Sequence, residues 1–269
     1  MNFSKNNDII KTSLDSSGIF RICLNNPSNH NALSNEMMNK ILSELNEASE
    51  QKKIRVVIIS SEGPTFSAGH DLKELKESRK NSDKGKKSYK DLMKKCSKLM
   101  QAIVNNPKPV IAEVDGVATA AGCQLVASCD LAYATKSSKF ATPGVNIGLF
   151  CSTPMVALSR NISNKHSMEM LLTGELISAD KAVKIGLINE VIDNVSLQKY
   201  ITEIALKISK KSAMTLKIGK EAFYKQIDMN LMEAYDFASR VMVENMLKLD
   251  AEEGIDAFIE KRKPNWQDK

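Results

Sequence analysis

Two stretches of this sequence, Phe66-Ser67-Ala68-Gly69-His70-Asp71-Leu72-Lys73-Glu74 and Ala121-Gly122-Cys123-Gln124-Leu125, are the most informative about its fold. Each combines a glycine and small side chains with the expected start of a helix. Glycine adopts backbone angles that other residues avoid, and small side chains let a ligand approach the main chain. The first turn of a helix also offers unpaired N–H groups and the positive end of its dipole. The two stretches therefore predict loops that bind a ligand through the backbone.

Thioester chemistry makes use of such loops. When negative charge develops on the carbonyl oxygen of a thioester, two converging N–H groups stabilise it without any titrating group. The N–H of His70 is one candidate donor, and the small-residue loop before Gln124 offers another. Either loop alone is weak evidence, because glycine and small residues are the usual punctuation of turns.

The rest of the chain alternates strands with helices. We expect strands at Ile19–Leu24, Val56–Ser60, Val110–Val114 and Leu131–Ala134. Ser34 is the expected N-cap of a helix, residues 61–68 a loop, and Asp71 a helix start, while Thr142-Pro143-Gly144 opens a long loop. The expected C-terminal helices are Leu197–Ser209, Ala213–Gln226, Leu231–Leu249 and Ile255–Lys263. This alternation predicts an α/β fold with largely parallel strand pairing.

The composition is typical of a globular protein, with 42% hydrophobic and 26% charged residues among 269. Apolar runs such as Val56–Ile59 are too short to cross a bilayer, so no membrane span is expected. Met1–Lys5 lacks the features of a secretory or mitochondrial presequence, which predicts a cytoplasmic protein; a mitochondrial matrix location would require a presequence that has been removed. The five cysteines show no CxxC spacing and the three histidines lie far apart, so no metal site is expected.

The net charge of +6 is concentrated in one segment. Eight basic and two acidic residues lie between Arg79 and Lys95, and the other 30 basic and 30 acidic residues cancel. A solvated loop and helix face is the ordinary explanation of such a run, and electrostatic attraction of a polyanionic small molecule is the alternative. Aromatic residues make up only 5% of the chain, and no stacking platform accompanies the run, so nucleic acid is not an expected partner.

Several motifs, taken together and in order, resemble those of the enoyl-CoA hydratase/isomerase (crotonase) superfamily. The two stretches quoted above resemble its two-part signature, with about 50 residues between them. Asn25-Asn26-Pro27 with Asn31-Ala32-Leu33 resembles the family's N-terminal coenzyme A loop. Residues 172–179 followed by Gly186-Leu187-Ile188 resemble its middle segment, and residues 258–264 resemble its C-terminal end. The likeness spans nearly the whole chain.

The resemblance implies a crotonase (ClpP-like) spiral of ββα units over residues 1–195, which binds acyl-CoA. A C-terminal helical region over residues 196–269 would form a homotrimer or a dimer of trimers, and the apolar 229–249 helix also indicates an oligomer contact. The oxyanion hole would consist of the N–H groups of His70 and Ala121. No metal or redox cofactor is implied, since coenzyme A is part of the substrate. The implied coenzyme A contacts, the last two of which could come from a neighbouring subunit, are Asn29, His30, Ala32, Ala68, His70, Asp71, Leu72, Lys73, Lys261 and Lys263.

The sequence departs from the family at the acid–base positions. Hydratases of this family use two glutamates on one bound water. At the matching positions this chain has Gln124, which cannot take a proton, and Gly144, which has no side chain. The position used by many enoyl isomerases is Ser152. Hydration is therefore expected to be weak or absent.

Other side chains near the motifs could substitute for the missing acids. Asp71 and Asp130 match family positions that are usually structural, and the backbone of His70 is a stronger candidate than its imidazole. Cys123 and Cys151 would act as nucleophiles only if their thiol pKa values were lowered. Cys123, near a helix N-terminus, is the better candidate of the two, although a buried apolar role is the commoner fate of a free cysteine.

The leading interpretation is an acyl-CoA thioester-binding protein of this family, nominally of the lyase class and of fatty acid metabolism. If it is an enzyme, its chemistry runs through a stabilised thioester enolate. A non-catalytic acyl-CoA binder or regulator is one alternative. A decarboxylase or thioester hydrolase on the same scaffold is another, because neither reaction needs the two glutamates.

Overall fold

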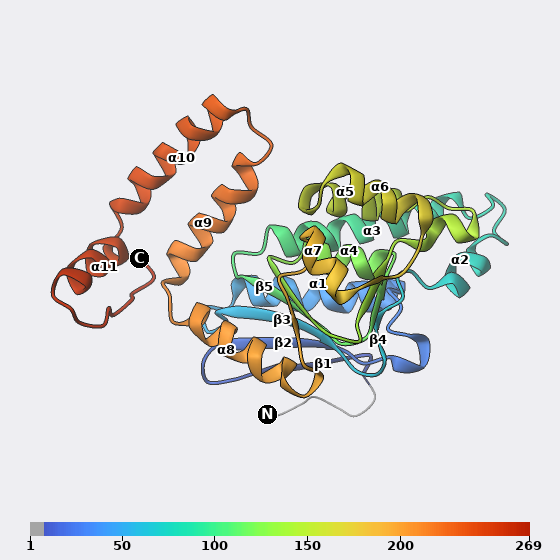
Figure 1. Ribbon diagram of the computed structural model, residues 1–269, viewed down its shortest axis with the longest axis horizontal. Helices are drawn as coiled ribbons and strands as arrows, with labels where there is room; N and C mark the ends of the chain where they lie inside the picture. The colour runs from blue at the N-terminus through green and yellow to red at the C-terminus, as the bar shows by residue number, and fades with distance from the viewer. Residues whose placement is uncertain (1–7) are drawn as a thin grey trace.

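The structure is a computed structural model that describes residues 8–269, so the Met1–Lys5 stretch that bears on targeting lies outside the described residues. The described chain forms two sheets with helices around them and a helical arm to one side (Figure 1). One sheet has the strand order β1-β2-β3-β5-β7-β10, and the other has the order β4-β6-β8-β9. The β1–β2 and β8–β9 pairs are antiparallel and the other described pairs are parallel, which confirms the predicted α/β class.

The strands are β1 (Ile10–Leu14), β2 (Ile19–Leu24), β3 (Val56–Ser61), β4 (Thr65–Ser67), β5 (Val110–Val114), β6 (Val117–Thr119), β7 (Leu131–Thr135), β8 (Lys139–Ala141), β9 (Ile177–Ser178) and β10 (Glu190–Ile192). The α-helices are α1 (Asn35–Glu50), α2 (Leu72–Ser78), α3 (Lys86–Val104), α4 (Ala121–Ser128), α5 (Ser152–Asn161), α6 (Asn164–Thr173), α7 (Ala179–Ile185), α8 (Leu197–Ser209), α9 (Ala213–Gln226), α10 (Leu231–Met246) and α11 (Leu249–Ile259). Short 3-10 helices are η1 (Pro27–Asn29), η2 (Pro143–Ile147) and η3 (Asn194–Ser196).

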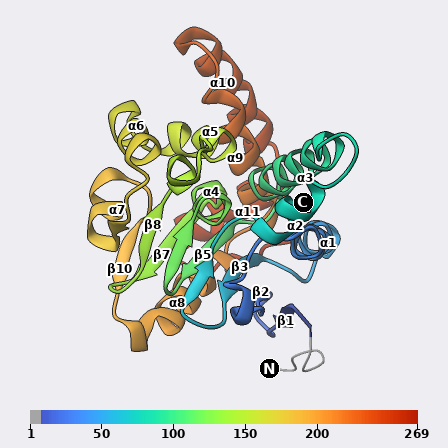
Figure 2. The ribbon, with the colours of Figure 1, turned by 90° about the vertical axis from the view of Figure 1, so that its right-hand side faces the viewer.

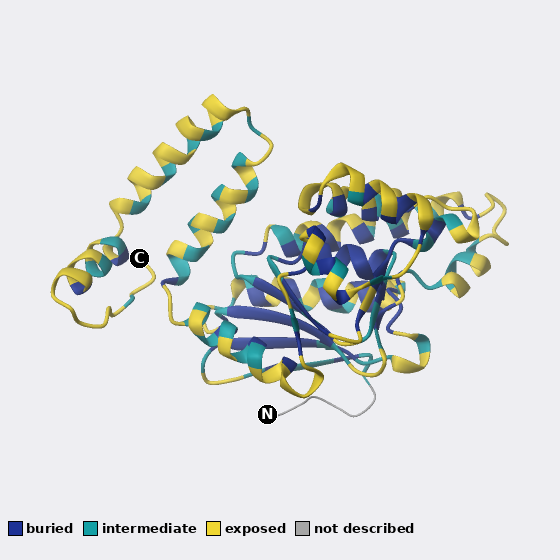
Figure 3. Ribbon diagram, viewed as in Figure 1, coloured by how far each residue is buried: buried dark blue, intermediate teal, exposed yellow. Residues whose placement is uncertain are grey.

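Helices cover both faces of the six-stranded sheet. On one face, Leu197, Ile201 and Ala205 of α8 pack against apolar side chains of β2, β3 and β5. Helices α1, α3 and α4 lie over the other face and form the main core with the same strands (Figures 1 and 2). The central strands are buried on both sides, which explains why β3 reads as a continuous apolar run. Figure 3 shows the buried residues gathered in this sheet and in the helices above it.

Helix α1 forms where its sequence predicted. The hydroxyl oxygen of Ser34 accepts a hydrogen bond from the N–H of Met37 at 3.1 Å and so caps the first turn. One face of the helix, which includes Met38, Ile41 and Leu45, is buried. The predicted bounds of β2, β3, β5, β7, α8 and α9 also agree with the structure to within one residue.

The structure corrects two predicted loops. Residues 61–68 contain β4, whose three residues are too few to show a periodic pattern. The long loop predicted after Thr142 instead holds η2, α5 and α6. Pro143 and Gly144 are turn residues and suggested a loop. Pro154 is nevertheless compatible with a helix, because it lies in the first turn of α5, where a backbone N–H would have no acceptor within the helix.

Helices α9, α10 and α11 project from the core and are called the arm below (Figure 1). The ammonium nitrogen of Lys220 on α9 lies 2.6 Å from Asp130 Oδ2 and also donates to two backbone carbonyls of the core. The hydroxyl of Tyr224 donates to Asp130 Oδ1 at 2.9 Å. These contacts fasten the base of the arm to the core.

The far end of the arm departs from the predicted helix bounds. The helix predicted at 231–249 ends at Met246, and the last helix begins at Leu249 rather than Ile255. No glycine or proline marks this break, so the sequence carries no local signal for it. Among the described residues, no helix is long and apolar enough to cross a membrane.

Candidate functional site

The two quoted stretches and the Thr142 turn meet at one edge of the four-stranded sheet. β4, β6 and β8 are parallel neighbours, so their carboxyl ends lie side by side, where ligands commonly bind in sheets of this kind. β4 leads into residues 68–71, β6 into residues 120–124 and β8 into residues 142–144. The fold therefore brings the turns that carry His70, Ala121, Gln124 and Gly144 to neighbouring strand ends.

The turns after β4 and β6 are in direct contact. Gly69 has a φ of +86°, and a Cβ on it would lie 2.8 Å from Ala120 Cβ and 3.0 Å from the nitrogen of Ala121. A Cβ on Gly122 would lie 2.2 Å from the carbonyl oxygen of Ser67. Any larger residue at either glycine would force the turns apart. Ala120 has a φ of 51° and a ψ of −119°, which is strained for a residue with a side chain.

The two predicted backbone donors lie beside this contact. Within residues 8–269, neither the N–H of His70 nor the N–H of Ala121 donates a hydrogen bond. Ala121 is the first residue of α4, and the first-turn N–H groups of a helix have no acceptor inside it. A polarised or negatively charged oxygen is the kind of group that such donors bind.

The N-terminal loop packs beside the turn after β4. The N–H of Ala68 donates to the carbonyl of His30 at 3.0 Å, and the N–H of Leu33 donates to the carbonyl of Gly69 at 2.7 Å. Asn31 is buried, and its side-chain amide donates to the carbonyl of Glu62, just after β3, and to the carbonyl of Thr65 at the start of β4. The structure thus joins the two loops into one surface. Of the predicted coenzyme A contacts, Asn29, His30, Ala68, His70, Asp71, Leu72 and Lys73 lie on this surface, and Ala32 is buried beneath it.

Asp71 is a structural link in this surface. Its carboxylate accepts the N–H of Lys73 at 2.8 Å at the start of α2, and its second oxygen accepts Asn29 Nδ2 at 2.7 Å. Burial alone would raise the pKa of Asp71, but the hydrogen bonds from Asn29, Lys73 and Glu74 outweigh it and hold the pKa below its ordinary value. The carboxylate is therefore ionised at neutral pH, and its oxygens already accept hydrogen bonds from the start of α2 and from Asn29.

Gln124 and Gly144, the residues predicted to replace the two glutamates, differ in their surroundings. Gln124 is buried in α4, and its Oε1 accepts a long hydrogen bond from Cys96 Sγ at 3.7 Å. A Cβ on Gly144 would lie 2.8 Å from the carbonyl oxygen of Leu149 and 2.9 Å from Cys151 Sγ. The N–H of Gly144 donates to that sulfur at 3.3 Å. Neighbouring atoms therefore fill the space at position 144.

The candidate nucleophiles and the imidazole are all uncharged at neutral pH. Burial raises the pKa of Cys123 to about 12, so the prediction that it is the better nucleophile is wrong. Burial also raises the pKa of Cys151, but the N–H of Gly144 opposes that shift. Burial lowers the pKa of His70, whose Nδ1 lies 3.4 Å from the carbonyl oxygen of Leu33. Its backbone remains the stronger candidate.

Four other candidates lie outside the turns that follow β4, β6 and β8. The carboxylate of Asp130 is occupied by the anchor of the arm, a structural position of the kind expected. Ser152 is exposed at the start of α5. Lys261 and Lys263 follow α11 on the arm, at the opposite end of the long axis from α2 (Figure 1). Within one chain, the structure does not bring these lysines to the strand ends.

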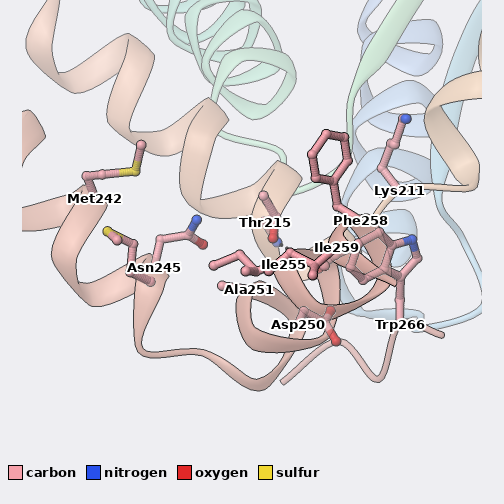
Figure 4. Close-up of a pocket in the computed structure, with 13 residues that line it drawn as sticks. Lys211, Thr215, Met242, Asn245, Asp250, Ala251, Ile255, Phe258, Ile259 and Trp266 are labelled. Carbon is pink, nitrogen blue, oxygen red and sulfur yellow. Dashed lines mark hydrogen bonds between the residues drawn. The ribbon is translucent and has the colours of Figure 1, made fainter. Parts of the chain in front are cut away.

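A cavity of about 580 Å³ lies in the arm rather than at the strand ends. It is bounded by α9, α10 and α11, and its lining includes Met242, Ile255, Phe258 and Trp266 (Figure 4). None of the predicted site residues lines it. In the part of the chain that the structure describes, no group of three histidine, cysteine, aspartate or glutamate residues could hold a metal ion.

Sequence comparison places this architecture among known proteins. A model of the enoyl-CoA hydratase/isomerase family matches residues 15–269. Rat enoyl-CoA hydratase domain-containing protein 3, mitochondrial, is 49% identical over 249 residues, which cover 93% of this chain and 81% of the relative. The probable mitochondrial enoyl-CoA hydratase of Dictyostelium discoideum is 32% identical over 92% of this chain and 87% of its own length.

Solved structures agree with the sequence comparison. The crystal structure of human enoyl Coenzyme A hydratase domain-containing protein 3 superposes with a TM-score of 0.91 at 46% identity, over 96% of this chain and 100% of that one. An enoyl-CoA hydratase of Mycobacterium smegmatis gives a TM-score of 0.91 at 42% identity, over 96% of this chain and 99% of that one. The similarity thus extends over both the sheets and the helical arm.

Proposed function

The chain belongs to the enoyl-CoA hydratase/isomerase family, and from that membership we propose that it binds an acyl-CoA thioester. One observation carries the proposal: the N–H groups of His70 and Ala121 lie at neighbouring strand ends and have no acceptor within residues 8–269. A thioester carbonyl oxygen between them would receive two hydrogen bonds. An enolate oxygen would receive stronger ones, because its charge is greater.

Coenzyme A would follow the surface that the N-terminal loop and the start of α2 share. His30, Ala68, Leu72 and Lys73 are exposed there, so the nucleotide and the pantetheine arm have polar and apolar groups to contact. Asp71 would act indirectly, by holding Asn29 and the start of α2 in place. In this proposal coenzyme A is part of the substrate, and no further cofactor takes part.

Hydration of an enoyl thioester would be weak or absent. The reaction needs one group to activate water and another to handle the proton at the α carbon, and Gln124 and Gly144 supply neither. The residues at the three strand ends include one carboxylate, Asp71, and the helix cap occupies it. A non-catalytic acyl-CoA binder or regulator is consistent with the same observations.

The lack of a free carboxylate favours decarboxylation as a second candidate reaction. A 2-carboxyacyl thioester loses carbon dioxide when its C–C bond breaks, and the electron pair moves into the thioester to form an enolate that is then protonated at the α carbon. The first step takes its electrons from the substrate and needs no protein base. An ionised glutamate would repel the substrate carboxylate, whereas Gln124 would not. Thioester hydrolysis, in contrast, requires an activated water.

We also infer that the chain assembles as a homotrimer or a dimer of trimers through the 196–269 region. Large apolar side chains on the arm are exposed in a single chain, among them Leu231 at 75%, Met246 at 59% and Phe258 at 86%. Surfaces of this kind usually mark a protein contact. Assembly would also be the means by which Lys261 and Lys263 reach the coenzyme A phosphates of a neighbouring subunit.

Two observations point to different compartments for this protein. Met1–Lys5 suggested a cytoplasmic protein, whereas the domain-containing protein 3 relatives are named as mitochondrial. We propose the mitochondrial matrix on the strength of these relatives. Subcellular fractionation with cytosolic and matrix markers tests this choice, and recovery in the cytosol alone would overturn it.

Acyl-CoA binding is tested by calorimetric titration with acetyl-CoA and by the spectrum of a bound cinnamoyl-CoA. Polarisation of the carbonyl between two N–H groups should move the cinnamoyl absorbance to longer wavelength, and added salt should weaken the binding of the anionic ligand. Lack of acetyl-CoA binding at low salt would overturn the proposal. Turnover of crotonyl-, malonyl- or 3-hydroxyacyl-CoA would then distinguish among the reactions, and binding without turnover would favour the regulator.

A further inference from the structure

The outer face of α3 carries a lysine stripe, defined here as Lys87, Lys90, Lys94 and Lys98. The four residues follow the three- and four-residue spacing that places side chains along one side of a helix. All four are exposed, and within residues 8–269 none of them forms an ion pair. Asp91 is the one acidic residue along the same side.

The lysine stripe faces away from Gln124, at the acyl end of the proposed site. Cys96 lies on the buried side of α3, and its sulfur contacts Gln124 at 3.7 Å. At about 100° per residue, Lys87, Lys94 and Lys98 lie about 160–180° around the helix from Cys96. An acyl group beside Gln124 therefore cannot contact these lysines, and the stripe calls for another explanation.

The positive charge continues beyond the stripe. Arg79, Lys80 and Lys84 are exposed in the turn that leads into α3. Asp83, the acidic residue of this turn, is used locally, because its carboxylate accepts the N–H groups of Gly85 and Lys87 at 2.9 and 2.8 Å. The surplus of the 79–95 segment equals the net charge of +6 of the entire chain. The segment that holds most of the stripe thus carries the positive surplus of the chain, although Lys80 is paired with Glu77 at 2.6 Å. The stripe and this turn are called the basic face below.

We propose that this basic face binds the surface of an anionic phospholipid membrane. From Lys87 to Lys98 the lysine stripe extends about 16 Å along α3, at about 1.5 Å per residue, which is suited to several phosphate headgroups in a plane. Basic residues near such a surface contribute about 1 kcal/mol each through the negative surface potential. The one aromatic residue of the segment, Tyr89, donates its hydroxyl to the carbonyl of Leu75, so no stacking platform for nucleic acid bases accompanies the lysines.

Flotation of the intact protein with lipid vesicles tests this proposal. We expect binding to phosphatidylcholine vesicles that contain phosphatidylglycerol, no binding to phosphatidylcholine alone, and release by salt. The triple variant Lys87→Gln, Lys90→Gln and Lys94→Gln should lower the vesicle partition coefficient about 100-fold, which follows from about 1 kcal/mol per lysine. A matched control, with Lys52, Lys53 and Lys184 each changed to Gln, removes the same charge from other exposed positions and should retain nearly all the binding.

Acetyl-CoA titration of the same variants separates this proposal from the proposed function. The lysine-stripe variant should keep its acetyl-CoA affinity within about threefold, since charges beyond about 10 Å are largely screened at ordinary salt. Loss of acetyl-CoA affinity without vesicle binding by the wild type would show that the face attracts coenzyme A instead. Equal losses in both triple variants, or tighter binding to duplex DNA than to the vesicles, would also overturn the membrane proposal.

Discussion

The two halves of the candidate site are held in different ways. The backbone half, formed by the N–H groups of His70 and Ala121, depends on the contact of two turns that leaves no room for a Cβ at Gly69 or Gly122. The side-chain half consists of positions 124 and 144, and its chemistry depends on which residues occupy these two positions. The fold therefore holds the two proposed oxyanion donors in place, whereas the residues at positions 124 and 144 can change without disturbing them.

Glutamates are also harder to restore in the side-chain half than the sequence suggests. A missing acid would seem to leave an empty space that a glutamate could refill. At Gly144, however, the Leu149 carbonyl and the Cys151 thiol occupy that space. Neighbouring atoms fill the space beside Gly144, whereas Gln124 has the shape of a glutamate without its charge. The comparison between the two halves leads to four predictions.

The largest expected effect concerns hydration. The wild type should hydrate crotonyl-CoA at least about 10,000-fold more slowly than a relative with both glutamates, because each positioned proton-transfer group typically contributes about 100- to 10,000-fold. Loss of the enoyl absorbance measures this rate. Brisk hydration by the wild type would show that the side-chain half holds an unrecognised acid–base pair, with His70, Asp71 and Cys151 the first residues to test.

Restoration of the glutamates extends the same test. Gln124→Glu should fold, because the two side chains have nearly the same shape, and should raise the rate only modestly. Adding Gly144→Glu should destabilise the loop without further gain, and Cys151→Ala should relieve only part of the clash, because the Leu149 carbonyl remains in place. A full recovery by the two glutamates alone would show that the 144–151 loop moves more readily than its packing indicates.

The next effect concerns the packing of the backbone half. Gly122→Ala would place a methyl group against the carbonyl oxygen of Ser67 and should lower the free energy of unfolding by about 3 kcal/mol, at the upper end for overpacking, with loss of acetyl-CoA binding. Gly219→Ala is the control, because nothing lies within 4 Å of that position in α9, and alanine should stabilise the helix by up to about 1 kcal/mol. Equal thermal midpoints for the two variants would contradict the close contact.

Sequence patterns predicted the backbone half better than its surroundings. Gly69, the small-residue run before Gln124 and the cap at Ser34 carry local signals, and in the structure Gly69 packs against that run and Ser34 caps α1. The strands between them were missed in part. β4, β6 and β8 have three residues each, so no alternation of apolar and polar residues can develop.

Contacts between distant segments could not be predicted from local patterns. The sulfur of Cys151 beside Gly144, and the Lys220–Asp130 pair that anchors the arm, join segments that only the tertiary fold brings together. Cys123 illustrates the same difficulty. Its place near a helix N-terminus suggested a lowered thiol pKa, but complete burial has the larger effect and raises it.

A smaller effect is expected at the cap that joins the coenzyme A loop to α2. Asp71→Ala should lower the free energy of unfolding by about 1 kcal/mol and weaken acetyl-CoA binding, because the N–H of Lys73 and the side chain of Asn29 lose their acceptor. The pKa of Asp71 is lowered in the folded state. Its contribution is therefore complete above the unfolded pKa of about 3.9 and is lost as the pH falls through the folded pKa. Asp71→Asn should keep much of the cap and remove this acid dependence, and urea unfolding across that pH range measures both effects.

The smallest effect on acetyl-CoA binding is expected at Ala120, next to the two donors. Its φ of 51° with a ψ of −119° is a conformation that glycine adopts without strain. Relief of that strain should stabilise Ala120→Gly by about 1–3 kcal/mol, whereas the greater backbone freedom of glycine in the unfolded chain should destabilise it by about 0.5–1 kcal/mol. The strain term is the larger of the two, so we expect a net stabilisation of between zero and about 2.5 kcal/mol in urea unfolding.

The same variant tests whether acetyl-CoA binding depends on the side chain at position 120. Glycine at 120 retains the peptide that presents the N–H of Ala121, so acetyl-CoA affinity should change by less than about threefold, or about 0.7 kcal/mol. Ala120→Val is the matched control, since a β-branched residue tolerates a positive φ poorly and should lose both stability and binding. If Ala120→Gly instead destabilised the protein and abolished acetyl-CoA binding, the methyl group of Ala120, which lies against Gly69, would be what holds the two turns together, and the donors would depend on a side-chain contact rather than on the backbone alone.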